Sequence, residues 1–63
     1  MTKGIVEFNS YLKNDVNVNV YEIEYHWGTA TLKGIYYGWE DTAQKVGRVL
    51  ENEGIAWSTI MKL

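Results

Sequence analysis

Hydrophobic and polar residues alternate through the middle of the chain. From Tyr21 to Trp27 the apolar side chains occupy the odd positions, while Glu22, Glu24 and His26 occupy the even ones. A period of two places successive side chains on opposite faces of a β-strand. The dipeptide Gly28-Thr29 suits a two-residue turn that begins with glycine, and a second strand follows it. The pattern therefore predicts a hairpin with one apolar face and one polar face.

The two-residue turn also fixes the register of this hairpin. Counting outward from the turn places apolar residues opposite one another on one face and an acid opposite a lysine on the other. A slip of one residue would remove both kinds of match, because it moves every side chain to the other face. The predicted pairs are Trp27 with Ala30, Tyr25 with Leu32, Ile23 with Gly34, Tyr21 with Tyr36, His26 with Thr31, Glu24 with Lys33 and Glu22 with Ile35.

A second alternating stretch precedes the hairpin, and its phase is different. The valines of residues 16–20 occupy even positions, whereas the apolar residues from Tyr21 onward occupy odd ones. This change predicts a bulge, a bend or a junction between two strands at this point. The strand-like segment 5–8 and the segment 16–20 are candidates for a first hairpin around the turn residues 13–15. Residues 4–12 either pair within the chain or exchange onto a neighbouring copy.

One amphipathic helix is predicted after the hairpin. Asp41, with Gln44 three residues later, predicts a capping box at the start of this helix. Gly54 suits the left-handed position just past the helix, which would bring Leu50 and Ile55 into contact across a Schellman ending. Apolar residues recur between these ends at spacings of three and four, which defines a single buried stripe. The stripe consists of Ala43, Val46, Val49 and Leu50.

A glycine lies in the middle of this helix, and a last strand follows it. Gly47 costs about 1 kcal/mol relative to Ala in a helix interior, so its presence indicates a close approach of the helix to the sheet. The strand is predicted over residues 56–63. Its alternation would place Trp57, Thr59, Met61 and Leu63 on one face, with Ser58, Ile60 and Lys62 on the other.

The predicted order is strand, strand, strand, helix, strand within a single domain, residues 1–63. We expect an α+β fold in which one helix covers one face of a small antiparallel sheet of about three to five strands. The arm Thr31-Leu32-Lys33-Gly34, the single helix and the aromatic strand after it resemble half of a β-grasp domain, such as the immunoglobulin-binding domains of proteins G and L. The resemblance covers about half of the chain; it implies a fold and assigns no binding residues.

Composition narrows the classes of partner. The 63 residues contain no Cys and no Pro, and six basic against eight acidic residues give a net charge of −2. A chain of this length buries only about 60% of the surface of its unfolded state, so its stability is small. The acidic balance disfavours duplex nucleic acid and anionic membranes as partners. Since no apolar run is long enough to span a bilayer and no apolar signal segment follows Met1, we expect a cytoplasmic protein.

The arrangement closest to a chemical site is Glu22-x-Glu24-x-His26 on one strand face. Ligands two residues apart can share a divalent metal, but Lys33 is predicted opposite Glu24 and the chain has no second His. An acid–base pair of the two carboxylates lacks a pocket on a flat sheet face. No Cys, no Gly-x-Ser-x-Gly and no phosphate-binding glycine loop is present. We therefore expect no enzyme activity, no catalytic residue, no metal and no cofactor.

The nine aromatic residues exceed what one short helix can cover. We expect Tyr21, Tyr25, Trp27 and Trp57 beneath the helix. The register places other aromatic and apolar residues on the opposite face of the sheet, beside the acidic ones. Tyr and Trp carry interface hot spots, because they bury a large area with few rotatable bonds. The predicted partner contacts on this face are Glu22, Glu24, His26, Ile35 and Tyr37.

These features favour a small non-enzymatic module that binds another protein. In size and character the chain resembles the host-takeover proteins of bacteriophages, which block a host enzyme by occupying its surface; the resemblance implies a host protein as the partner. Two alternatives use the same aromatics. The first is a structural homo-oligomer with no separate target. The second is a binder of single-stranded nucleic acid that stacks bases on the sheet.

Overall fold

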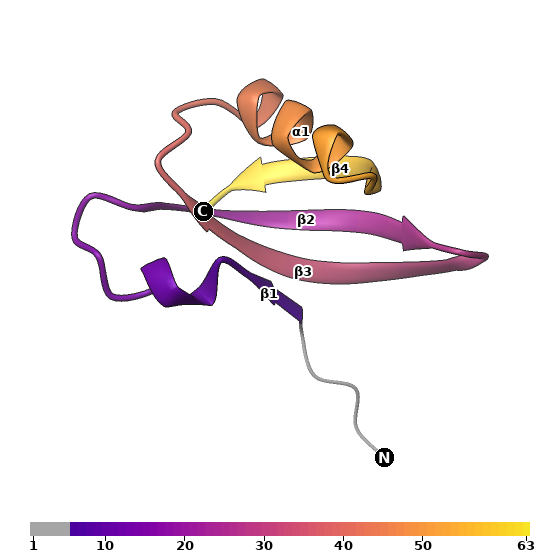
Figure 1. Ribbon diagram of the computed structural model, residues 1–63, viewed down its shortest axis with the longest axis horizontal. Helices are drawn as coiled ribbons and strands as arrows, with labels where there is room; N and C mark the ends of the chain where they lie inside the picture. Colours follow the sequence, from indigo (N-terminus) through magenta and orange to yellow (C-terminus); the bar gives the residue numbers. More distant parts are fainter. Residues whose placement is uncertain (1–5) are drawn as a thin grey trace, which may run out of the picture.

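The computed structural model describes residues 6–63, and the part of the predicted first strand before Val6 lies outside this range. The order of elements confirms the predicted strand, strand, strand, helix, strand, with a 3-10 turn added after the first strand. Figure 1 shows their arrangement. The elements are β1 (Val6–Phe8), η1 (Ser10–Leu12), β2 (Asn19–Trp27), β3 (Ala30–Gly38), α1 (Ala43–Asn52) and β4 (Ala56–Lys62).

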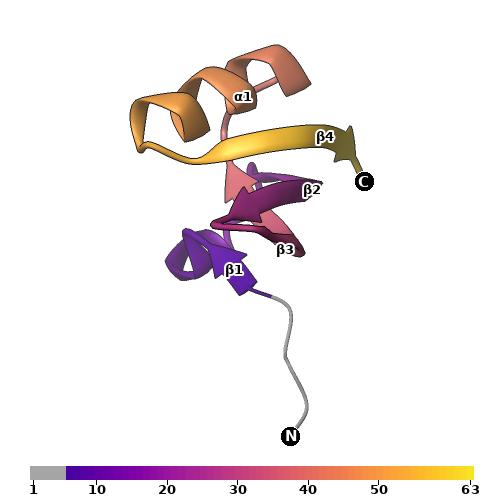
Figure 2. The same cartoon turned by 90° about the vertical axis from the view of Figure 1, so that its right-hand side faces the viewer.

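The four strands form one mixed sheet in the order β1-β3-β2-β4. The hairpin of β2 and β3 occupies the centre, β4 runs antiparallel to β2, and β1 runs parallel to β3. Figure 2 shows α1, β4, β2, β3 and β1 following one another from top to bottom. The predicted α+β class with one helix is confirmed, and its sheet is antiparallel except at β1.

The central hairpin has the predicted register at every pair from Tyr21–Tyr36 to Trp27–Ala30. Gly28 begins the turn with φ 64, a value that glycine adopts without strain. Thr29 does not take a positive φ, as expected for a turn in which glycine comes first. The register could be predicted because the turn and the alternation are both local features of the sequence.

The first hairpin predicted from segments 5–8 and 16–20 is wrong. β1 pairs with β3 instead, in parallel and within the same chain. The Asp15 side chain accepts a hydrogen bond from the Asn17 backbone N–H at 2.9 Å. The Asp15 backbone carbonyl accepts a second one from the Val18 N–H. These bonds close a turn in which Val16 is 93% exposed. The alternating valines therefore begin in a loop, and the strand starts only at Asn19.

The predicted irregularity at Val20–Tyr21 is also wrong, because β2 runs unbroken through this point. The register shift lies instead between β2 and β4, where Tyr25 pairs with Trp57 but Glu24 pairs with Thr59. One extra residue, Ser58, therefore stands in β4 as a bulge. The bulge overturns the simple alternation predicted for this strand, because Trp57 and Ile60 now share the face toward α1.

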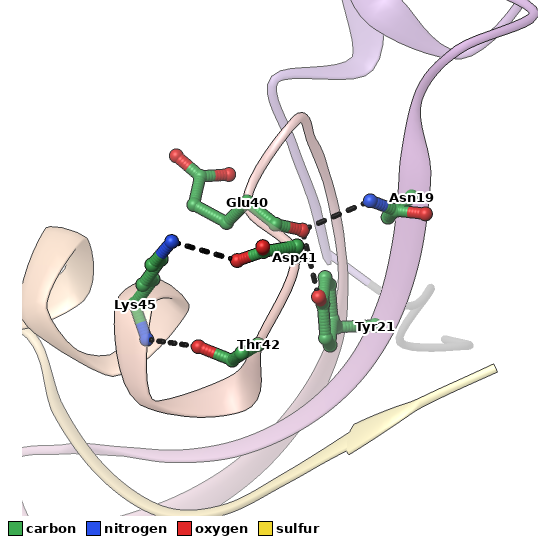
Figure 3. Close-up of polar contacts among 6 residues, drawn as sticks. All are labelled: Asn19, Tyr21, Glu40, Asp41, Thr42 and Lys45. Carbon is green, nitrogen blue, oxygen red and sulfur yellow. Dashed lines mark hydrogen bonds and ion pairs between the residues drawn. The ribbon is translucent and has the colours of Figure 1, made fainter.

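The helix begins one residue later than predicted. Thr42 is its N-cap, and the Thr42 hydroxyl accepts a hydrogen bond from the Lys45 backbone N–H at 3.2 Å. Asp41 instead forms an ion pair with Lys45, with 2.9 Å between Oδ1 and Nζ. Figure 3 shows both contacts at the first turn. Because the hydroxyl satisfies a helix-end N–H that has no other partner, Thr42 takes the role predicted for Asp41.

The end of the helix confirms the predicted Schellman motif. Gly54 has φ 82, and its N–H donates to the Glu51 carbonyl at 3.0 Å. The Ile55 N–H donates to the Leu50 carbonyl at 2.9 Å. These two bonds give hydrogen-bond partners to carbonyls of the last helical turn, and the left-handed conformation of Gly54 makes them geometrically possible.

The core lies between α1 and one face of the sheet. Gly47 confirms the predicted close approach, since a Cβ there would lie 2.9 Å from Trp57 Cε2. Trp57 Nε1 donates to the Gly47 carbonyl at 3.2 Å, which ties α1 to β4. The Glu40 carbonyl accepts from the buried Tyr21 hydroxyl at 2.7 Å and from Asn19 Nδ2 at 3.0 Å (Figure 3). The buried cluster consists of Tyr21, Ile23, Tyr25, Tyr36, Val46 and Leu50.

Candidate protein interface

The helix is too short to cover the hairpin that it packs against. Ten residues of α-helix span about 15 Å, whereas nine residues of strand span about 30 Å. The part of this face near the turn therefore extends beyond α1. Trp27 lies there and is 68% exposed, so the prediction that it lies beneath the helix is wrong.

An open groove occupies this uncovered part of the sheet. Its volume is about 310 Å³ and every residue that lines it is apolar or aromatic. Among its lining residues Tyr25 is buried, whereas Trp27 and the 43%-exposed Val6 are exposed to solvent. Phe8 packs edge-on against Tyr25, with 5.4 Å between the ring centroids. We call this site the apolar groove; it is lined by Val6, Phe8, Tyr25, Trp27, Leu32 and Ile55.

A smaller depression continues the apolar groove toward the end of α1. It measures about 100 Å³ and shares Phe8 and Ile55 with the groove. Glu53, the C-cap residue of α1, contributes to its lining. The last turn of α1 carries no basic residue, so nothing within that turn offsets the negative end of the helix dipole. The depression that adjoins the apolar groove therefore carries an acidic residue, Glu53, at the negative end of the helix.

The five residues predicted as partner contacts lie together on the other face of the sheet, which we call the outer face. Glu22 pairs across β2 and β3 with Ile35, and His26 Nδ1 lies 3.2 Å from the hydroxyl of Thr31, its cross-strand partner. Both carboxylate residues, His26 and Ile35 are half-buried. The register thus brings the predicted set onto one surface, as the alternation required.

Tyr37 differs from the other four because it is only 7% exposed. Its hydroxyl donates to Glu7 Oε2 at 3.1 Å, and the same oxygen lies 3.3 Å from Lys13 Nζ, just after η1. Asn9 Nδ2 donates to the Tyr37 carbonyl at 3.1 Å. The segment that contains η1 therefore packs against the end of β3 and buries the Tyr37 side chain.

The outer face carries a shallow depression that combines charged and apolar side chains. A depression of about 130 Å³ lies across β3, β2 and β4, and its lining includes Glu22, Glu24 and Lys33. The Ser58 hydroxyl donates to Glu24 Oε1 at 3.3 Å. Within residues 6–63, no three His, Cys, Asp or Glu side chains are arranged to hold a metal ion. This face can offer a partner charge and hydrogen bonds, together with apolar area from the 54%-exposed Met61.

The largest pKa shift belongs to Tyr36, a buried core residue, rather than to a residue of either surface. Burial raises the pKa of Tyr36 strongly, and the neighbouring Glu40 carboxylate raises it further. Burial also raises the pKa of Tyr21, with smaller contributions from Asp41 and Glu40. For Tyr37, burial and then the bond to Glu7 raise the pKa. All three hydroxyls stay protonated near neutral pH, and those of Tyr21 and Tyr37 donate hydrogen bonds.

Comparison of the chain with known protein families, with curated proteins and with solved structures finds no match. No helix in the part of the chain described, residues 6–63, has the length and apolar character to cross a bilayer. The functional interpretation therefore rests on the surfaces themselves.

Sequence reasoning missed the apolar groove. Trp27 continues the apolar face of β2 without a break, so alternation alone assigns it to the core. The signal that reveals the groove is the difference in length between the hairpin strands and the helix. Phe8, Leu32 and Ile55 come from three separate segments, and their meeting depends on the parallel pairing of β1 with β3.

Proposed function

We propose that this chain is a small non-enzymatic module of the cytoplasm that binds another protein through the apolar groove. The observation that carries the proposal is a fully apolar groove with Trp27, 68% exposed, in its lining. Single exposed hydrophobic residues are common, whereas contiguous apolar patches mark interaction sites. Trp is also the residue most enriched among interface hot spots.

The outer face supplies a second, polar contact region in this proposal. Glu22, Glu24 and His26 stand beside Ile35 there, with Tyr37 as a buried support rather than a contact. Acidic groups of this kind increase the association rate with a basic surface more than they increase affinity. A protein of this size that covers an enzyme surface in this way would act as an inhibitor of the bacteriophage type.

The test is selection of peptides from a random library on the immobilised protein, repeated with two variants. We expect Trp27→Ala to lose at least about tenfold in affinity for the selected peptides, because the indole lines the groove. Trp39→Ala is the matched control, since Trp39 is 56% exposed but does not line the groove. Urea unfolding of both variants checks that the fold is intact. Equal loss in both variants, or no selected peptide at all, would reject the apolar groove as the binding site.

A structural homo-oligomer is the second candidate, and the edge of β4 favours it. β4 pairs with β2 on one side only among the described strands. Its first six residues, Ala56 to Met61, carry no charge. The free side of an edge strand offers backbone N–H and C=O groups to a second copy, although the bulge at Ser58 and the terminal Lys62 oppose such pairing. This candidate requires an assembled species in light scattering of the pure protein.

A further inference from the structure

The proposed function leaves the chemistry of the partner open, and the apolar groove narrows it. We infer that the groove takes the apolar face of an amphipathic helix that carries Lys or Arg beside its apolar anchors. This inference rests on the proposed function and adds the class of binding segment. It follows from three properties of the groove: its lining, its position relative to the strand edges, and the charge in the depression that adjoins it.

The lining favours a helix over an extended segment. Every backbone N–H and C=O group buried on binding needs a hydrogen-bond partner. An extended peptide laid in the groove would find only apolar and aromatic side chains along its walls. The nearest strand edge is that of β1, and Val6 and Phe8 of this strand face the groove with apolar side chains. A helix satisfies its own backbone and needs from the groove only apolar contact.

The charge in the adjoining depression favours a basic segment. Glu53 lines the depression that continues the groove, and no residue that lines either hollow is basic. Glu51 lies in the same last turn, where the helix dipole adds negative potential. The ion pairs found within residues 6–63 are Lys13 with Glu7 and Lys45 with Asp41, so neither Glu51 nor Glu53 is paired there. A Lys or Arg of the partner can form an ion pair with these carboxylates.

The volumes of the groove and of its continuation suit a few bulky apolar side chains of a partner rather than a large ligand. The groove and its continuation measure about 310 and 100 Å³. Apolar side chains at i, i+3, i+4 and i+7 of a helix project in one row and can enter such a groove together. The row would run from Trp27, near the hairpin turn, toward Glu53 at the end of α1.

The experiment uses three labelled peptides of the same length, about 14 residues or four helical turns. The first places Leu at helical spacing with Lys elsewhere, the second replaces Lys with Glu, and the third has the Leu and Lys of the first in strict alternation. Fluorescence anisotropy measures binding to the wild-type protein. We expect the first peptide to bind at least about tenfold more tightly than either of the others.

Two pairs of variants locate the site. Trp27→Ala should weaken the first peptide at least about tenfold, while Trp39→Ala should leave it unchanged. Glu53→Lys should weaken it about threefold to tenfold at low salt, an effect that salt reduces. Glu22→Lys makes the same change of charge on the outer face and is the matched control. Lys suits the C-terminal end of a helix, so Glu53→Lys is expected to fold.

Each outcome separates the inference from the proposed function. Tighter binding of the second or third peptide, or an equal effect of Glu22→Lys and Glu53→Lys, overturns the inference. So does a dimer in light scattering that Trp27→Ala converts to monomer, because the occupant is then a second copy. If none of the three peptides binds while library peptides still require Trp27, the inference fails and the proposed function stands.

Discussion

The contact between Gly47 and Trp57 is the tightest point of the packing between α1 and β4. The indole covers the Gly47 backbone and donates to its carbonyl at 3.2 Å. A methyl group at position 47 would overlap the six-membered ring of the indole. Two effects therefore oppose each other when Gly47 is replaced by Ala: better helix propensity and overpacking.

We predict that Gly47→Ala lowers the free energy of unfolding. Ala gains about 1 kcal/mol in helix propensity, whereas overpacking against a held ring costs about 1–3 kcal/mol. A net loss of up to about 2 kcal/mol follows from these two magnitudes, and urea unfolding measures it. In a Trp57→Ala background the space is free, so the same substitution should stabilise the protein. A gain in stability from Gly47→Ala alone would show that the ring moves away at little cost.

The buried tyrosines predict a loss of stability at alkaline pH. Burial raises the pKa of Tyr21, Tyr36 and Tyr37 above the ordinary value of 10.0. Above about pH 10 the unfolded chain releases these protons while the folded chain retains them. The unfolded state then binds fewer protons, so the free energy of unfolding falls as pH rises. The tyrosines contribute their full stabilisation below their pKa in the unfolded chain, and this stabilisation is lost progressively as the pH rises above that pKa.

Urea midpoints at about pH 9 and pH 11 measure this loss. Tyr36→Phe should reduce the fall between the two pH values, because it removes the group whose pKa is raised most. Tyr11→Phe is the matched control, since the Tyr11 ring is 81% exposed. An identical fall in the wild-type protein and in Tyr36→Phe would contradict the assignment of the alkaline loss to this core tyrosine.

At the scale of elements, the start of α1 distinguishes two candidate caps. Thr42→Ala should cost about 1 kcal/mol, because it removes the hydroxyl that accepts from the Lys45 N–H in the first turn of the helix. Asp41→Ala removes an exposed i, i+4 ion pair and should cost less. Thermal or urea unfolding compares the two variants directly. A larger loss for Asp41→Ala would restore the cap that the sequence suggested.

The elements that the sequence predicts well are those whose signals are local. The turn at Gly28-Thr29 and the Schellman ending at Gly54 each depend on a few neighbouring residues, and both are confirmed. The partner of β1 could not be predicted, because its pairing joins Val6–Phe8 to residues 34–36 across the intervening loop and β2. The bulge at Ser58 was hidden for a related reason: it exists only relative to β2.

The candidate surfaces divide in the same way. The outer face could be predicted, since period two and one register place Glu22, Glu24, His26 and Ile35 together. The burial of Tyr37 could not, because Glu7 and the segment around η1 cover it from a distant part of the chain. The apolar groove depends on relative element lengths and on β1, so alternation alone does not reveal it.

At the scale of the whole molecule, the β4 edge of the sheet determines its tendency to assemble. On the free side of the sheet next to α1, β4 carries a bulge at Ser58 and ends at Lys62. Bulges and terminal lysines both discourage pairing between copies. We therefore predict a monomer of 7.3 kDa in light scattering on a sizing column.

Lys62→Pro provides the control for this prediction. The Leu63 N–H donates to the Val20 carbonyl at 2.8 Å, so alternation turns the Lys62 N–H toward the free edge. Proline is tolerated at such an edge position. A dimer in the wild-type protein that Lys62→Pro converts to monomer would contradict the prediction and support the homo-oligomer.

The central position of the β2–β3 hairpin also determines the order in which the strands fold and in which they unfold locally. β2 and β3 close through a two-residue loop, so they can form early and fast. β1 pairs late, because it must close a long loop to reach β3, and its three residues detach most easily. The apolar groove is therefore bordered by the β2–β3 hairpin, whose backbone amide hydrogens should exchange slowly, and by β1, which can open without global unfolding. A partner would meet a rigid hairpin on one side and an adjustable strand on the other.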